Sequence, residues 1–147
     1  MQYADLDSTI KPAVEAAIKA KAHAYCPYSN FRVGSAVLTE DGQIFAGCNV
    51  ESASYGLSVC AERVAIMNAV THGYQSFKAI VVCCDIKGSF EGSCGACRQF
   101  YAEFGLDWEI YLVKPDKTWK KVLVKELLPM AFSPKSLQEE RITDSSN

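Results

Sequence analysis

Histidine is the scarcest of the catalytically versatile side chains in this sequence. The 147 residues contain only two, His23 and His72. His23 falls in the first expected helix and His72 stands just before Gly73, where a helix is expected to end, so both are interpreted as structural. Because no histidine accompanies the cysteine-rich segments, cysteine–histidine nucleophilic catalysis is poorly supported.

The sequence also lacks long apolar runs and an excess of positive charge. No stretch is long enough and apolar enough to span a bilayer. The first residues lack the charged start and apolar core of a signal peptide. The formal net charge is −2, which gives no overall attraction for nucleic acid. We therefore expect a cytoplasmic protein with neither a membrane nor a nucleic-acid partner.

The composition is that of a globular protein, with 49% hydrophobic and 22% charged residues. A chain of 147 residues suits one domain with a substantial core. We expect a single domain over residues 1–147, ending in a polar, mobile tail from about residue 137. The seven cysteines are an odd number and do not suit a disulfide framework. In a reducing compartment, clustered cysteines are metal ligands or core residues.

Two cysteine-containing segments indicate the chemistry. In the first, Cys60 precedes Glu62 by two residues, and in the second, Cys94 precedes Cys97 by three. Three thiolates can hold a zinc ion and leave its fourth tetrahedral position open for water. Glu62 is not needed as a ligand and is therefore free to move protons. Helix-forming residues follow both segments, so the thiols are expected at helix N-termini, where the helix dipole favours the thiolate.

The pattern along the chain predicts alternating helices and strands. Helices are expected from the caps at residues 7–9 to about 24, and over 61–72, 95–104 and 125–128; strands are expected over 32–38, 43–48, 77–84, 109–113 and 119–124. The run 77–84 is continuously apolar, as in a central strand buried on both faces. Its adjacent Cys83 and Cys84 are interpreted as core residues on opposite faces.

Three polar residues near the first segment have two interpretations each. Asn49 and Glu51 alternate with Val50 and can point the same way from a strand end. They are either a turn cap and a solvated charge or substrate ligands, and their position on the run into Cys60 favours ligands. Arg63 is either a donor to a cysteine sulfur or half of a surface ion pair, and we favour the sulfur.

The motifs occur in an order that resembles the short, three-cysteine, homotetrameric cytidine deaminases. The zinc deaminases combine a cysteine-bound zinc with a glutamate that is not a ligand. The resemblance is carried by Cys26-Pro27-Tyr28-Ser29, Phe31-Arg32-Val33-Gly34, Gly47-Cys48-Asn49-Val50-Glu51, Cys60-Ala61-Glu62-Arg63, Cys94-Gly95-Ala96-Cys97-Arg98-Gln99 and Glu126-Leu127-Leu128-Pro129 with Phe132.

This resemblance implies an α/β fold, a single three-layer domain in which helices flank a mixed sheet of about five strands. It implies zinc-dependent hydrolytic deamination of free cytidine and deoxycytidine to uridine and deoxyuridine plus ammonia, as in pyrimidine salvage. It also implies a homotetramer with a nucleoside substrate and one Zn²⁺ per chain.

The resemblance further implies a role for individual residues. At the metal centre, it implies zinc binding by Cys60, Cys94 and Cys97, proton transfer by Glu62, and donation to a cysteine sulfur by Arg63. For the substrate, it implies ribose binding by Asn49 and Glu51, contact with the pyrimidine ring by Phe31, and contact with the base edge by the backbone of Ala61. It also implies that Phe132 enters a neighbouring subunit's pocket.

The sequence departs from the family pattern at three positions. Ser93 stands where the family usually has proline, and Gly56 and Ser58 differ from the usual residues of their loop. Proline pre-sets the entry to a helix, whereas serine can cap the helix. We expect the zinc site to survive with a slightly looser loop.

Two alternatives to a nucleoside deaminase remain open. One is a deaminase of another aminopyrimidine, such as a nucleoside antibiotic or a polynucleotide base, although Glu51 would repel a phosphate. The other is a non-catalytic structural zinc module, closed by a fourth ligand. The candidates for that ligand are Cys26, Cys48, Cys83 and Cys84. Glu62 would have no purpose in such a module.

Overall fold

Strand β3 (Phe77–Cys84) is the centre of the fold because both of its faces are buried. The computed structural model describes residues 1–143, so the last four residues of the expected tail lie outside the described residues. Ile80 and Val82 belong to one buried cluster, whereas Val81 and Cys83 belong to another on the opposite face. The apolar run therefore forms the two-sided central strand that its sequence predicts.

Five strands form one mixed sheet in the order β2-β1-β3-β4-β5. The other four strands are β1 (Val33–Thr39), β2 (Ile44–Cys48), β4 (Glu109–Val113) and β5 (Trp119–Leu123). Strands β3 and β4 are parallel, and the other neighbouring pairs are antiparallel. The carboxyl ends of β3 and β4 therefore meet at the same edge of the sheet, where α/β proteins bind ligands.

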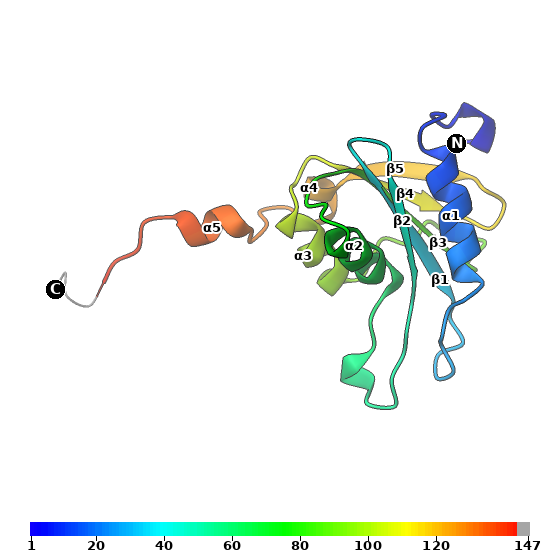
Figure 1. Ribbon diagram of the computed structural model, residues 1–147, viewed down its shortest axis with the longest axis horizontal. Coiled ribbons are helices and arrows are strands. Elements are labelled where there is room, and N and C mark those ends of the chain that lie inside the picture. Colours follow the sequence, from blue (N-terminus) through cyan, green and yellow to red (C-terminus); the bar gives the residue numbers. More distant parts are fainter. Residues whose placement is uncertain (144–147) are drawn as a thin grey trace.

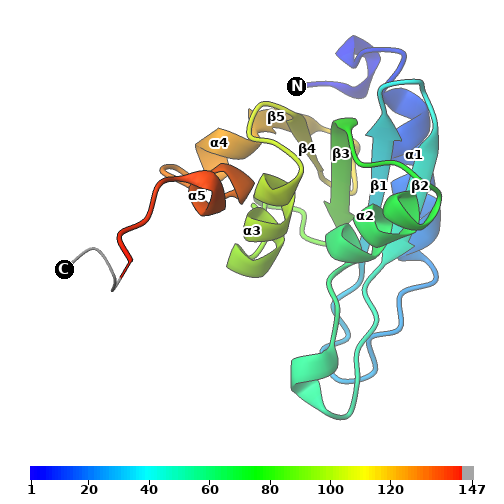
Figure 2. The ribbon, with the colours of Figure 1, turned by 60° about the vertical axis from the view of Figure 1, so that its left-hand side comes forward.

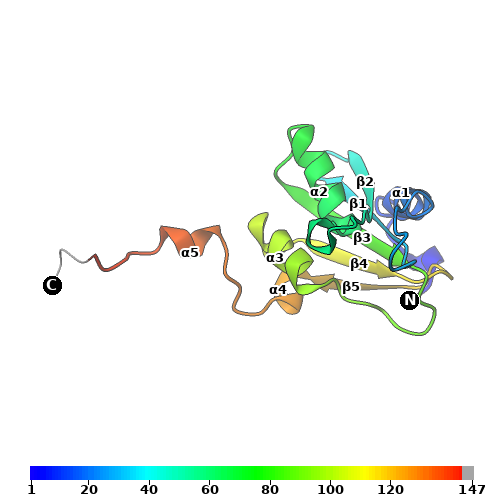
Figure 3. The same ribbon diagram turned by 90° about the horizontal axis from the view of Figure 1, so that it is seen from below.

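Helices cover both faces of this sheet (Figure 1). Helix α1 (Lys11–Lys21) packs on one face, and α2 (Ala61–Thr71) and α3 (Gly95–Glu103) pack on the other. The view from below shows the same three layers (Figure 3). The expected α/β fold with a five-stranded mixed sheet is confirmed. Helix α1 ends at Lys21, three residues before the expected end.

Two glycines allow helices to approach the sheet closely. A Cβ atom at Gly47 on β2 would lie 2.5 Å from the backbone nitrogen of Ala65 in α2. A Cβ atom at Gly34 on β1 would lie 2.0 Å from the carbonyl oxygen of Ala17 in α1. Only glycine permits these contacts, because any other side chain would force the helix away from the strand.

The C-terminal part contains a short helix that the pattern analysis does not predict. After α4 (Val124–Leu127), helix α5 (Pro134–Gln138) lies apart from the sheet (Figures 1 and 2). The tail expected from residue 137 thus begins within α5. Two short 3₁₀ helices, Tyr3–Asp5 and Tyr55–Leu57, complete the elements of residues 1–143. Within this range, no helix is long and apolar enough to cross a membrane.

Candidate active site and metal centre

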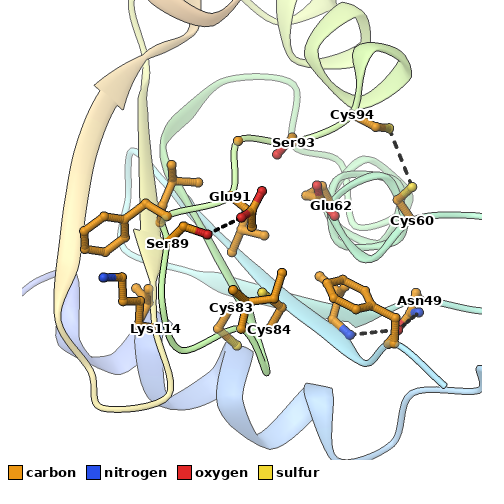
Figure 4. Close-up of a pocket in the computed structure, with 18 of the residues that line it drawn as sticks. Asn49, Cys60, Glu62, Cys83, Cys84, Ser89, Glu91, Ser93, Cys94 and Lys114 are labelled. Carbon is orange, nitrogen blue, oxygen red and sulfur yellow. Dashed lines mark hydrogen bonds between the residues drawn. The ribbon is translucent and has the colours of Figure 1, made fainter. Parts of the chain in front are cut away.

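A cavity of about 290 Å³ opens where β3 and β4 end and α2 and α3 begin (Figure 4). Its lining combines residues that are far apart in the sequence. Of the expected site residues, Phe31, Asn49, Glu51, Cys60, Glu62 and Cys94 line it. Its size and its mixture of apolar walls and a few polar groups suit a small ligand.

Three cysteine sulfurs converge beside this cavity. Cys60 and Cys94 are the N-cap residues of α2 and α3, and Cys97 lies in the first turn of α3. All three Sγ atoms lie within 4.8 Å of one another, and those of Cys60 and Cys94 are 3.8 Å apart. Neither cap makes a side-chain hydrogen bond to its helix. Both helices therefore direct their first side chains toward one point.

The electrostatics of the cluster favour metal binding. Hydrogen bonds from the Cys97 thiol and then from Arg63 lower the pKa of Cys60, to about 5. The hydrogen bond to Cys60 and burial raise the pKa of Cys97, so Cys60 is the more acidic of these two thiols and the one that more readily forms the metal-binding thiolate. By contrast, burial raises the pKa of Cys83 to about 11, so its thiol stays protonated. Within residues 1–143, three thiols form the cluster without a fourth ligand, which is the donor set of an open tetrahedral zinc site.

Glu62 is held close to the cluster but outside it. It is the second residue of α2, its exposed fraction is 5%, and it lines the cavity. Burial raises the pKa of its carboxyl group above the usual value. A buried carboxyl facing a substrate-sized cavity is suited to taking up and releasing protons.

Arg63 contacts the cluster from the helix side. Its Nη2 atom donates to the Cys60 sulfur at 3.6 Å, and its buried Nε atom has no hydrogen-bond partner among the described residues. The ion pairs found between residues 1 and 143 do not include Arg63. The guanidinium group therefore faces the Cys60 sulfur, where its positive charge can offset that of a thiolate.

Asn49 and Glu51 hold the cavity rim by bonding to backbone. The Asn49 amide donates to the Phe31 carbonyl at 2.7 Å and accepts from the Val33 nitrogen at 3.0 Å. The Glu51 carboxylate accepts from the nitrogens of Tyr28 and Ser29 and from the Ser29 hydroxyl. These bonds lower the pKa of Glu51, so it is ionised at neutral pH. Both side chains fix the segment that carries Phe31.

Two expected contact residues lie outside the cavity lining. Ala61 is fully buried at the start of α2. Phe132 has an exposed fraction of 60% and follows α4, where its carbonyl oxygen accepts a hydrogen bond from Gln99 at 2.7 Å. Within one chain, the structure therefore does not bring Phe132 to the cavity.

Comparison with known proteins agrees with this geometry. Residues 7–113 match the family model described as the cytidine and deoxycytidylate deaminase zinc-binding region. The chain belongs to this deaminase family. A probable cytidine deaminase of Dictyostelium discoideum is 48% identical over 143 residues, covering 94% of this chain and 97% of that protein. A cytidine deaminase of Sporosarcina psychrophila is 46% identical over 120 residues, covering 81% and 88%.

A solved structure shares the deaminase fold. The cytidine deaminase of Burkholderia pseudomallei is 44% identical, superposes with a TM-score of 0.79, and is matched over 83% of this chain and 98% of its own. A zinc cofactor follows from the family and from the three sulfurs placed to bind a metal ion. Among the described residues, no cysteine, histidine or acidic side chain completes a four-ligand cluster with them.

The deaminase cavity also contains residues that sequence reasoning missed. Ser89, Phe90, Glu91 and Lys114 line it from the segments after β3 and β4. Cys84 lines it too, although it was expected in the core, because α2 and α3 no longer cover the end of β3. The parallel pairing of β3 and β4 could have indicated these residues, because ligands bind at the carboxyl ends of such strands.

The expected capping role of Ser93 is wrong. Cys94 is the N-cap of α3, and the Ser93 hydroxyl instead bonds the Tyr101 hydroxyl at 2.6 Å. Arg98 donates to the Ser93 carbonyl oxygen at 2.7 Å. The hydroxyl group and the carbonyl oxygen of Ser93 are therefore both held by hydrogen bonds, without a proline at this position.

Proposed function

We propose that this chain is a zinc-dependent hydrolase that deaminates free cytidine and deoxycytidine to uridine and deoxyuridine with release of ammonia. One observation carries the proposal: a single cavity brings a three-sulfur cluster and a buried, unligated Glu62 together. The family membership and the named activity of relatives at 46–48% identity support it.

In this proposal, Cys60, Cys94 and Cys97 hold the zinc, and Arg63 offsets part of their charge. Bound zinc lowers the pKa of water and so supplies a nucleophile at neutral pH. Glu62 takes the proton that the water loses and passes it to the ring nitrogen next to the amino-bearing carbon. Once the hydroxyl group has added to that carbon, Glu62 moves the hydroxyl proton to the amino nitrogen. The carbon–nitrogen bond then breaks, ammonia leaves and the carbonyl group of the uracil ring forms.

Residues of the cavity lining, and Ala61 beside it, orient the nucleoside. Phe31 provides an apolar surface beside the pyrimidine, and the backbone of Ala61 contacts the base edge. Asn49 and Glu51 keep some hydrogen-bonding capacity beyond their backbone contacts, which serves the ribose hydroxyls. The acidic residues Glu51 and Glu91 outnumber the one basic residue of the lining, Lys114, so the lining disfavours a phosphate and favours a free nucleoside.

The decisive experiment compares wild-type protein with Glu62→Gln. Turnover of cytidine and deoxycytidine is followed by ultraviolet absorbance, and bound zinc is quantified on the same samples. We expect wild-type turnover with about one zinc per chain. Glu62→Gln should keep its zinc and lose about 10²- to 10⁴-fold in kcat. Glu103→Gln, an exposed substitution on α3, is the matched control and should behave as wild type.

Full activity of Glu62→Gln would refute the proton-transfer role. Zinc without wild-type turnover would refute nucleoside deamination and favour another aminopyrimidine or a structural zinc module. Turnover without zinc would refute the role of the three cysteines.

A homotetrameric assembly completes the proposal. Several large apolar side chains are exposed near the cavity rim: Tyr25, Tyr28, Val50, Tyr55 and Leu57. A neighbouring subunit would cover them, and its Phe132 would reach this cavity. Sedimentation would show tetramers, and Phe132→Ala would raise KM; monomers with unchanged KM would contradict this. The seven free cysteines fit a reducing cytoplasm and a role in pyrimidine salvage.

A further inference from the structure

A hydrogen-bonded pair of hydroxyls is buried behind the candidate catalytic centre. Tyr101 on α3 is fully buried, and Ser93 has an exposed fraction of 7%. Their oxygens are 2.6 Å apart. Tyr101 belongs to the apolar cluster that covers one face of the sheet, and a buried hydroxyl costs free energy unless it finds a partner. The position of the two hydroxyls behind the catalytic centre therefore needs an explanation.

The Tyr101 hydroxyl is held in one place by its surroundings. Its ring packs edge-on against Trp108, with ring centroids 5.7 Å apart and an interplanar angle of 84°. The Trp108 indole nitrogen also donates to the Tyr101 carbonyl oxygen at 3.2 Å. The phenol is therefore aimed at Ser93 by a rigid, buried frame.

Ser93 is fixed at its backbone as well. Arg98 donates through Nε to the Ser93 carbonyl and, through Nη1, to the Leu127 carbonyl at 2.9 Å. The guanidinium group also occupies the space beside Gly92, where an added Cβ would lie 2.6 Å from its Nη2 atom. With both backbone and hydroxyl restrained, Ser93 presents its hydroxyl to the cavity in one orientation.

Glu62 lies next to this hydroxyl. Figure 4 shows Ser93 and Glu62 among the cavity residues between the starts of α2 and α3. Burial raises the pKa of the Glu62 carboxyl group, and hydrogen bonding by its own backbone amide, the Ser93 hydroxyl and the Cys97 thiol acts in the opposite direction. Cys97 has no proton to donate once it binds metal as a thiolate. Ser93 then becomes the remaining side-chain donor of these three groups.

We propose that Ser93 and Tyr101 are positioning residues that form a donor chain, with Tyr101 donating to Ser93 and Ser93 donating to the Glu62 carboxylate. A carboxylate is a stronger acceptor than a phenol, so the Ser93 proton turns to Glu62 and its oxygen accepts from Tyr101. This inference rests on the proposed function.

The test measures kcat and KM for cytidine in Ser93→Ala, Tyr101→Phe and the double variant, with zinc content and Tm recorded for each. Loss of a hydrogen bond to a charged group should lower kcat of Ser93→Ala about ten- to a hundredfold and leave KM within about twofold. Tyr101→Phe should lower kcat about two- to tenfold. The double variant should match Ser93→Ala, because the two residues act through one bond.

Two further variants separate positioning from folding. Ser93→Thr keeps the hydroxyl and should recover most of the kcat that Ser93→Ala loses. Ser35→Ala removes a buried hydroxyl that bonds the Val81 carbonyl at 2.8 Å, away from the cavity lining. It should lower Tm without changing kcat.

The proposal is overturned if Ser93→Ala and Tyr101→Phe keep kcat within twofold of wild type, or if Ser93→Ala changes only KM or zinc content. It is also overturned if the two effects on kcat multiply in the double variant. Should Ser93→Ala not fold, Tyr101→Phe decides by its kcat alone. Failure of the proposed function would look different, because wild-type protein would not turn over cytidine or Glu62→Gln would remain active.

Discussion

Replacing Gly47 with alanine should disturb the catalytic centre without touching any residue that lines it. The new Cβ atom would lie 2.5 Å from the Ala65 nitrogen and 2.9 Å from the Ala61 carbonyl oxygen. Both are backbone atoms of α2, so no flexible side chain can move aside. Ordinary contact starts near 3.4 Å, so the helix must shift by about 1 Å relative to β2.

This shift acts on both stability and catalysis. Overpacking of this kind costs about 1–3 kcal/mol. For a chain of this length, that cost corresponds to a Tm lower by roughly 3–10 °C. Helix α2 also carries Cys60 and Glu62, whereas Cys94 and Cys97 stand on α3. A displacement of about 1 Å between reacting groups can lower kcat about a hundredfold.

Calorimetry, zinc analysis and steady-state kinetics on Gly47→Ala would measure Tm, zinc content and kcat. The control is Gly88→Ala, since its Cβ would meet nothing within 4 Å and its φ is not in the left-handed region. The control should match wild type in Tm and zinc content. A Gly47→Ala protein with Tm within 1 °C of wild type, full zinc and unchanged kcat would show that the contact between β2 and α2 does not position the site.

Three other perturbations have clear expected outcomes. Arg63→Ala should speed zinc loss to a chelator, because the thiolates lose a neighbouring cation; an unchanged loss rate together with unchanged kcat would remove that role. The Arg32 hydrogen bond holds the pKa of Asp85 below its usual value. The ionised carboxylate therefore stabilises the fold fully above about pH 4, and this stabilisation is lost as the pH falls through the lowered pKa. Asp85→Asn should therefore lower Tm at pH 7 by at most about 3 °C and leave it unchanged near pH 2; an equal loss at both pH values would contradict this. Ser93→Pro should lower Tm by leaving the Tyr101 hydroxyl unpaired. Adding Tyr101→Phe should restore part of this loss of Tm, which differential scanning fluorimetry would detect. If Tm is not restored, the proline itself distorts the loop.

The sheet and its three main helices could be predicted because local pattern and tertiary burial agree. The run from Phe77 to Cys84 is apolar throughout, and it is buried on both faces. Gly73 and Gly105, which follow the expected helix ends, both have positive φ values. The three cysteines and Glu62 could be found as well, because their short spacings already specify a ligand set and a free carboxyl group.

What the sequence pattern missed depends on contacts between distant residues. The Ser93 hydroxyl bonds Tyr101, eight positions later, and Ser93 lines the same cavity as Glu62, which belongs to an earlier helix. No periodicity in the sequence encodes either relation. Cys84 continues an apolar strand, but the helices no longer cover that end, so it lines the cavity. Helix α5 has only five residues, too few for a repeating apolar pattern to emerge.

The closeness of the sulfurs links metal retention to redox chemistry. The Sγ atoms of Cys60 and Cys94 are 3.8 Å apart, and a disulfide needs about 2.05 Å, so an approach of roughly 2 Å joins them. Cys94 is exposed, which lets an oxidant reach it. Once oxidised, neither sulfur can act as a thiolate ligand until a reductant opens the bond. Bound zinc thus protects the two thiols from oxidation, and a sample that has lost zinc and been oxidised recovers only if reductant is supplied before zinc.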